Sequence, residues 1–279
     1  MHFAPTLKQS GSLSVDYTTT KIKINDHEIP EVSETKFLGV IIDNKLNWLP
    51  HVEHLYKKLK AAVGILCRIR HYIPTENYKT LYSSLFESHL TYCITVWGGI
   101  PRTKIERLFR LQKHCVRILF GDLKTYLAKY ETAARTRPIG SQILGPEFYR
   151  KEHTKPLFTK VKLLALQNIY NYQCCIELLK ILKFRTPMAL YNLFKISPRN
   201  NSILLILPTK SHHFVFSASK IWNVIAKVLV EMDDIFGSIR IGPFKLALKR
   251  CILAIQNKYD EVEWYTTNFD IETIRDLKG

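Results

Sequence analysis

The sequence has no apolar run long enough to cross a lipid bilayer. Its longest apolar runs are Ala61–Cys67 and Ile203–Leu207, whereas a membrane-spanning helix needs about 20 apolar residues. The opening residues MHFAPTLKQSGSL also lack the apolar core of a signal peptide. These absences predict an intracellular protein, in the nucleus or the cytoplasm, with no membrane as a partner.

Cysteine and metal motifs are absent as well. None of the six cysteines forms a Cys-x-x-Cys pair, and neither His114–Cys115 nor His212–His213 completes a metal-ligand spacing. In a reducing compartment such cysteines pack as small core residues and build no disulfide framework. We therefore predict no metal site.

Signatures of catalysis are equally scarce. The sequence has no glycine-rich phosphate loop and no evident pairing of a nucleophile with a base. Its one Asp-Asp pair follows Met232, where a helical pattern ends before Gly237, so we interpret this pair as a solvated helix end. We predict no catalytic residue and no cofactor in this chain.

Acidic residues are few. The chain has 24 Asp and Glu against 41 Lys and Arg, a formal net charge of +17 and a pI of about 9.6. Because 46% of its residues are hydrophobic, the composition is that of a folded protein. A folded protein this basic usually binds an anion, most often nucleic acid or a membrane surface, and the charge alone does not choose between them.

The residues that are present predict a mainly α-helical fold with a small β unit near the N-terminus. Lys21–Val32 alternates around the turn residues Asn25 and Asp26, which predicts a β-hairpin. The dense apolar run Lys36–Ile42 predicts one buried strand with Gly39 inside it. Apolar residues at helical spacing then predict helices over about residues 47–73, 75–98, 102–120, 159–184, 188–194, 217–232 and 243–256.

An ordered series of motifs follows this pattern. ETKFLGVIIDNKLNW, at residues 34–48, is followed by LYSSLFESHLTYCITVWG at 81–98 and LFRLQKHCVRILFG at 108–121. Ile221–Asn223 and Phe244–Lys245 come near the end. The series resembles the C-terminal part of LINE-like, jockey-like reverse transcriptases of non-LTR retrotransposons, from the end of the palm subdomain through the thumb.

The resemblance, together with the composition of the remaining segments, implies a division of the chain into five parts. Residues 1–47 would be a remnant of the palm subdomain with a β-hairpin and the KFLGV strand, and residues 48–121 a thumb-like helical bundle. Residues 122–158 would form a linker or irregular loop, residues 159–259 a C-terminal helical region, and residues 260–279 an acidic tail.

The resemblance also implies a role beside a primer. In the family the KFLGV strand lies next to the primer terminus, which here implies nucleic-acid contacts at Lys36, Phe37, Leu38 and Gly39. The family's metal-binding aspartates precede this strand, whereas only Asp16 and Asp26 precede it here. We therefore expect a polymerase fragment that is inactive alone, whose Mg²⁺ would belong to the missing palm. Its partners would be an RNA or DNA primer-template and the rest of a retrotransposon polymerase.

The helix predicted over Arg102–Phe120 is the strongest binding candidate. At about 100° per residue, its apolar residues collect on one face. The opposite face collects the basic residues Arg102, Arg107, Arg110, Lys113 and Arg117, with His114 beside them and Glu106 as the one interruption. Cations gathered in this way repel one another unless water or phosphates neutralise them. The face is therefore either a nucleic-acid interface or an ordinary solvated helix face.

Other functions stay open. A non-catalytic basic nucleic-acid-binding helical protein would use the same helices. A structural or membrane-surface protein would instead present aromatic and aliphatic residues beneath a lysine-rich face. Trp48, Trp97 and Trp222 could stack on bases, but each borders an apolar helical pattern, which favours packing in the core.

Overall fold

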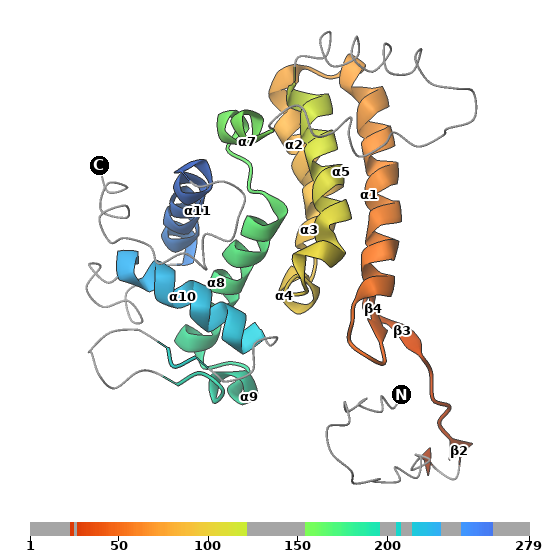
Figure 1. Cartoon of the computed structure of the whole chain (residues 1–279), viewed down its shortest axis with the longest axis vertical. Helices are drawn as coiled ribbons and strands as arrows, with labels where there is room; N and C mark the ends of the chain where they lie inside the picture. Colours follow the sequence, from red (N-terminus) through yellow and green to blue (C-terminus); the bar gives the residue numbers. More distant parts are fainter. Residues whose placement is uncertain are drawn as a thin grey trace. The chain divides into compact units, whose positions relative to one another are not determined.

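The computed structural model of the chain describes residues 23–24, 27–121, 154–195, 205–207, 214–229 and 241–258. The chain divides into two compact units, residues 1–57 and 58–279, and each is considered by itself. Helices dominate the described residues, and paired strands occur near the N-terminus (Figure 1). The predicted fold class, mainly α with a small N-terminal β unit, is confirmed. The predicted domain boundaries stay a prediction.

Several sequence predictions fall on residues outside this description. They concern the turn at Asn25 and Asp26, most of the linker over 122–158, His212–His213, the Asp-Asp pair after Met232, and the acidic tail.

The first unit contains two β-hairpins. β1 (Lys23–Ile24) pairs antiparallel with β2 (His27–Glu28), and this confirms the hairpin predicted from the alternating pattern. β3 (Glu34–Phe37) pairs antiparallel with β4 (Val40–Asp43), so that Phe37 lies opposite Val40.

The prediction of one continuous buried strand over Lys36–Ile42 is wrong. The chain reverses at Leu38 and Gly39, whose φ angles are 45° and 83°. Two successive positive φ angles are typical of the two-residue turn whose twist matches that of paired strands. Gly39 adopts this conformation freely, whereas Leu38 pays a steric cost for it. The predicted buried run is therefore a hairpin, and Phe37 and Leu38 are 62% and 73% exposed.

A buried carboxylate closes the loop between β4 and α1 (Leu49–Ile69). The Asp43 side chain accepts hydrogen bonds from the backbone N–H of Asn47, at 3.0 Å, and of Trp48, at 2.8 Å. Leu46 and Trp48 both have positive φ angles, of 51° and 62°. The motif residues Asp43, Leu46 and Trp48 therefore share one tight loop that leads into α1.

The helix predicted over residues 75–98 is present but interrupted. After η1 (Arg70–Tyr72) and η2 (Thr75–Asn77), the chain forms α2 (Tyr78–Tyr82), the π-helical turn η3 (Ser83–Glu87) and α3 (Ser88–Thr91). Cys93 then adopts a left-handed φ of 50°, and α4 (Ile94–Trp97) follows. The indole N–H of Trp97 donates to the Tyr92 carbonyl at 3.0 Å, which ties α4 to the break.

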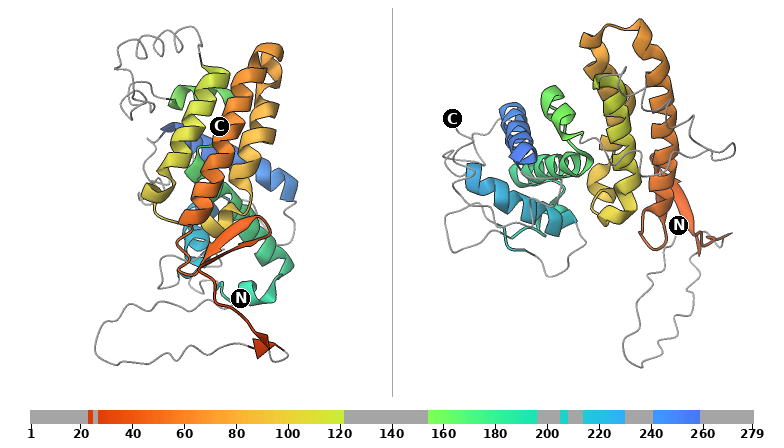
Figure 2. Two further views of the ribbon diagram at one scale, coloured as in Figure 1. Left: turned by 90° about the vertical axis from the view of Figure 1, so that its right-hand side faces the viewer. Right: turned by 45° about the horizontal axis from the view of Figure 1, so that its top comes forward.

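α5 (Arg102–Phe120) has the bounds that the sequence predicts. It packs against α2 and α8 (Leu166–Phe184) (Figure 2). Before it, Gly98 brings the chain close to α8. A Cβ at Gly98 would lie 2.6 Å from the Ile94 carbonyl oxygen and 2.7 Å from Cδ2 of Tyr170. The Trp-Gly end of the second motif therefore fixes a contact that a larger residue would block.

The helix predicted over residues 159–184 is two helices. α7 (Lys155–Val161) ends at Lys162, whose φ of 57° is left-handed, and α8 begins at Leu166. No glycine or proline marks this break in the sequence, so periodicity alone joins the two helices.

Two glutamine side chains satisfy the backbone between α7 and α8. Gln112 of α5 is fully buried, donates to the Leu164 carbonyl and accepts from the Leu166 N–H, both at 2.9 Å. It also donates to the Tyr82 hydroxyl at 2.9 Å, which joins α2 to the same point. Gln256 accepts from the Ala165 N–H at 2.9 Å. The connection is therefore held by amide side chains from helices on both sides of it.

α9 (Met188–Tyr191), α10 (Phe214–Leu229) and α11 (Ile241–Lys258) complete the described helices, with α10 and α11 alongside α8 (Figure 1). The Asn223 amide accepts from the Leu205 N–H and donates to its carbonyl, both at 2.8 Å. Trp97 and Trp222 are fully buried, which confirms their predicted core packing. All six cysteines are free, and Cys115, Cys174 and Cys175 lie in the core as expected.

Candidate nucleic-acid interface

α5 has a buried side and an exposed side along most of its length. Its buried apolar side chains are Ile105, Leu108, Phe109, Leu111, Cys115, Val116, Ile118 and Leu119. No acidic residue lies in its first turn, so the positive end of the helix dipole adds to the charge of Arg102. The exposed side is therefore positively charged from the first residue of the helix.

Three of the five predicted basic side chains are accessible. Arg102, Arg107 and Arg110 are exposed, and Lys113 is half-buried. Arg117 is only 4% exposed, because every residue from Cys115 to Leu119 is buried. Helical periodicity gives the direction of a side chain around the helix axis but not how deeply one end of the helix is covered. The accessible basic face of α5 is therefore Arg102, Arg107 and Arg110, with Lys113 at its edge.

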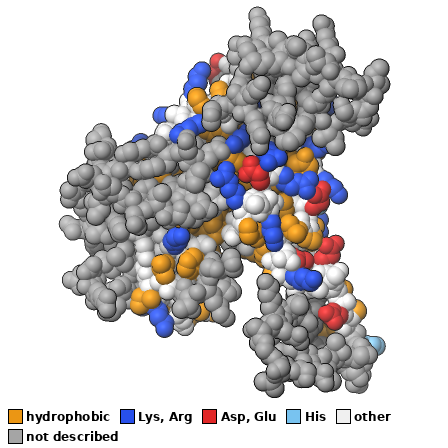
Figure 3. Space-filling model, viewed as in Figure 1, with side chains coloured by type: hydrophobic (Ala, Val, Ile, Leu, Met, Phe, Trp, Pro, Cys, Tyr) orange, Lys and Arg blue, Asp and Glu red, His pale blue; other side chains and the backbone are white. Residues whose placement is uncertain are grey.

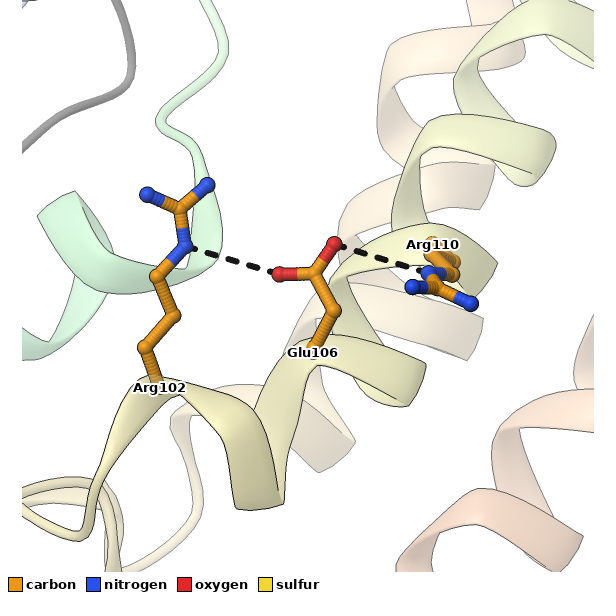
Figure 4. Close-up of polar contacts among 3 residues, drawn as sticks. All are labelled: Arg102, Glu106 and Arg110. Atoms are coloured by element: carbon orange, nitrogen blue, oxygen red, sulfur yellow. Dashed lines mark hydrogen bonds and ion pairs between the residues drawn. The ribbon is translucent and has the colours of Figure 1, made fainter. Parts of the chain in front are cut away.

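Glu106 joins two of these arginines. Its carboxylate lies 3.5 Å from Nε of Arg102 and 3.5 Å from Nε of Arg110 (Figure 4). Both pairs have the i,i+4 spacing that allows side chains on adjacent turns to meet. This spacing can be read directly from the sequence. One carboxylate between two guanidinium groups leaves the trio with a net positive charge and holds both arginines on the same side of the helix.

Lys113 and His114, at the edge of this face, both interact with other parts of the protein. The Lys113 ammonium lies 4.1 Å from the centroid of the Phe109 ring, in a cation–π contact. Burial, together with the nearby positive charge of Arg117, lowers the pKa of His114 to about 4. His114 is therefore neutral at pH 7 and adds no positive charge to the face at that pH.

The residues predicted to lie beside a primer are in the first unit. Lys36, Phe37 and Leu38 are exposed and Gly39 is partly exposed, all of them at the turn between β3 and β4. They present an apolar tip flanked by one lysine. The basic face of α5 belongs to the second unit, so the two predicted sets of contacts are separate structural elements.

No cluster of three or more His, Cys, Asp or Glu side chains in the described ranges could hold a metal ion. None of the helices resolved there is both long and apolar enough to span a membrane. Lys and Arg side chains are more abundant than Asp and Glu side chains on the face drawn in Figure 3.

The fold and this surface define a basic helical protein with an exposed arginine-rich face on α5. Part of it is similar to curated polymerases of mobile elements. The probable RNA-directed DNA polymerase from transposon X-element of Drosophila melanogaster is 25% identical over 107 residues, 37% of this chain. The RNA-directed DNA polymerase from mobile element jockey of Drosophila funebris is 26% identical over 103 residues, 36% of this chain. The chain thus contains a partial region like the reverse transcriptases of non-LTR retrotransposons, which confirms the resemblance carried by its motifs.

The chain spans only a small part of these relatives. It covers 12% of the length of the X-element polymerase and 11% of that of the jockey polymerase. No protein-family model matches the sequence, and no solved structure matches it.

Proposed function

We propose that this chain is a nucleic-acid-binding part of a retrotransposon reverse transcriptase and that α5 provides its main contact with phosphates. The similarity to mobile-element polymerases supports the class of ligand. The observation that carries the proposal is the exposure of Arg102, Arg107 and Arg110. At 100° per residue they lie within an arc of about 140°. The ligand would be an RNA or DNA primer-template, and α1 to α5 would act as its thumb.

The charges of α5 suit a backbone contact more than base recognition. Guanidinium groups on successive turns can each meet a phosphate, and each contact releases counterions from the nucleic acid. Such binding is tolerant of sequence and falls steeply with salt. The single carboxylate of Glu106 leaves the face positive, because it is shared by two arginines.

Charge reversal on α5 tests this proposal directly. A variant with Arg102→Glu, Arg107→Glu and Arg110→Glu should lose most of its affinity for a short duplex. The log–log dependence of affinity on salt should lose about one unit of slope for each phosphate contact removed. Arg117 stays unchanged, because it is buried and its substitution would disturb the fold.

A matched control distinguishes the contribution of this face to binding from the contribution of the total charge. Lys160, Lys245 and Arg250 are exposed on α7 and α11, and changing all three to Glu lowers the formal charge by the same amount. This control should bind nearly as well as the unchanged chain. Equal losses in the two variants would show that total charge, and no particular face, drives binding.

We also propose that the chain alone does not synthesise DNA. Its sequence contains no aromatic-x-Asp-Asp motif, and its one Asp-Asp pair follows Met232. A two-metal polymerase site needs carboxylates held together beside the reacting phosphates. The test is primer extension on an RNA template with Mg²⁺ or Mn²⁺, where only background is expected. Extension that is abolished by Asp233→Ala would contradict the proposal.

The second candidate is a non-catalytic basic nucleic-acid-binding helical protein with no polymerase partner. The absence of an aromatic-x-Asp-Asp motif from the sequence favours it equally. The two candidates differ in one respect, since the first expects the chain to complement a polymerase. Adding the chain to a retrotransposon polymerase that lacks its thumb should restore primer extension only if the first candidate is correct.

A further inference from the structure

A second surface combines exposed apolar side chains with cations. It is built by the end of α8, by α9, and by residues 205–207, whose Ile206 N–H donates to the Lys195 carbonyl at 2.7 Å. Its exposed large apolar side chains are Phe184, Met188, Leu193, Ile206 and Leu207. Hydrophobic and basic side chains lie next to each other at the lower left of Figure 3, the part of the view that contains α9 and α10. We call this second surface the α8–α9 surface.

The charge of this part of the chain has one sign. Every charged residue between Leu178 and Val230 is a Lys or an Arg. Lys183, Arg185 and Lys195 belong to the described part of that stretch, and Arg185 and Lys195 are exposed. No carboxylate within the stretch can therefore compete with an anionic ligand for these cations.

Arg185 occupies a backbone conformation that arginine does not favour. It follows the last residue of α8 with a φ of 53°, in the left-handed region where helices most often place glycine. Its guanidinium carbon lies 5.8 Å from the centroid of the Tyr191 ring. The neighbouring Phe184 ring is 57% exposed. An unfavourable backbone position thus carries a planar cation to an aromatic ring, and the preceding residue in the sequence bears a second ring that is open to solvent.

We infer that the α8–α9 surface binds single-stranded nucleic acid. Bases would stack on the Phe184 ring and on the guanidinium plane of Arg185, and phosphates would lie against Lys195. This combination of exposed aromatic ring, arginine and lysine is the one that sequence-tolerant single-strand binding uses. A duplex hides the faces of its bases, so this surface should discriminate against it. The inference rests on the proposed function, because it supposes that the chain binds nucleic acid.

Removal of one ring tests the stacking contact. In the full chain, Phe184→Ala should weaken binding of a labelled oligo(U) strand about tenfold, the effect of losing one stacked base. Binding of the duplex that the same strand forms with its complement should stay unchanged. Equal losses for strand and duplex, or no loss for either, would overturn the inference.

Glycine at position 185 separates a binding role from a structural one. Arg185→Gly relieves an unfavourable backbone conformation, so the variant should melt no lower than the unchanged chain while it loses affinity for oligo(U). Lys162→Gly is the matched control, because Lys162 is also an exposed cation at a left-handed helix end, that of α7. It should gain the same backbone relief and keep its affinity. If both variants bind oligo(U) alike, Arg185 makes no contact with the strand.

The proposed α5 interface and the proposed α8–α9 interface can be disproved independently of each other. Loss of duplex binding in the α5 charge-reversal variant, together with full binding of oligo(U) by Phe184→Ala, would leave the proposed function standing and overturn this inference. The opposite pattern would uphold the α8–α9 surface and remove α5 as the main contact.

Discussion

The β3–β4 turn and the helical motifs belong to the same series of family-like motifs, but their side chains differ in exposure to solvent. Phe37 and Leu38 are 62% and 73% exposed, whereas Tyr82, Trp97 and Gln112 are fully buried. The exposed pair contributes little burial and includes an unfavourable positive φ at Leu38. The same series of motifs therefore contains exposed side chains in one region and a buried structural junction in another.

The first prediction concerns the buried junction and has the largest expected effect. Gln112→Leu leaves the Leu164 carbonyl, the Leu166 N–H and the Tyr82 hydroxyl without their shared partner. Each unsatisfied buried group costs about 1–3 kcal/mol, so the free energy of unfolding should fall by about 3–5 kcal/mol. Urea denaturation followed by circular dichroism measures this loss. Gln173→Leu, at a half-buried position of α8, is the control and should change stability by less than about 0.5 kcal/mol. Similar losses of stability in Gln112→Leu and Gln173→Leu would show that the buried hydrogen bonds of Gln112 are not especially important for stability.

The second prediction concerns pH and His114. Burial, and then the charge of Arg117, lowers the pKa of His114 from 6.5 to about 4 in the folded state. The unfolded chain therefore binds the proton more tightly, and stability is complete above pH 6.5 and lost as the pH falls toward 4. The loss at pH 4 should approach about 3 kcal/mol.

Substitution identifies the group responsible for this loss. His114→Gln should flatten the dependence of unfolding free energy on pH between 6.5 and 4. His89→Gln changes an exposed histidine of α3 and should leave the dependence intact. A pH dependence that survives in His114→Gln would show that another group is titrating.

Some of these structural features could be predicted from the sequence, and others could not. The bounds of α5 follow from its periodicity, since its apolar residues recur at helical spacing along the whole segment. The burial of Arg117 does not follow, because it depends on how elements distant in sequence cover the end of the helix. The turn at Leu38 and Gly39 was missed because leucine is not a turn residue and Gly39 can equally mark a bulge. The break after α7 was missed because Lys162 ends the helix without glycine or proline. The α8–α9 surface left one signal in the sequence, a long stretch without acidic residues.

The third prediction compares two glycines. Gly98→Ala would place a Cβ 2.6 Å from the Ile94 carbonyl oxygen and 2.7 Å from the Tyr170 ring, so it should lower the free energy of unfolding by about 1–3 kcal/mol. Gly64→Ala has nothing within 4 Å and should raise it by about 0.5–1 kcal/mol, because alanine is the better helix former. Thermal melts of both variants give the two signs. A neutral Gly98→Ala would show that α4 and α8 can move apart at little cost.

The last prediction returns to the exposed turn and has the smallest effect on stability. Leu38→Asn should be neutral or raise the free energy of unfolding by a few tenths of a kcal/mol, because asparagine before glycine suits two positive φ angles better than leucine does. If the turn lies beside a primer, as the resemblance implies, the same change should weaken binding of a primer-template, since it removes an exposed apolar contact. Lys45→Gln, at another exposed position of the same unit, controls for a general effect on that surface. A variant that is no less stable and binds less well would assign Leu38 to function. A variant that binds equally well would show that leucine at this position serves neither the fold nor the ligand.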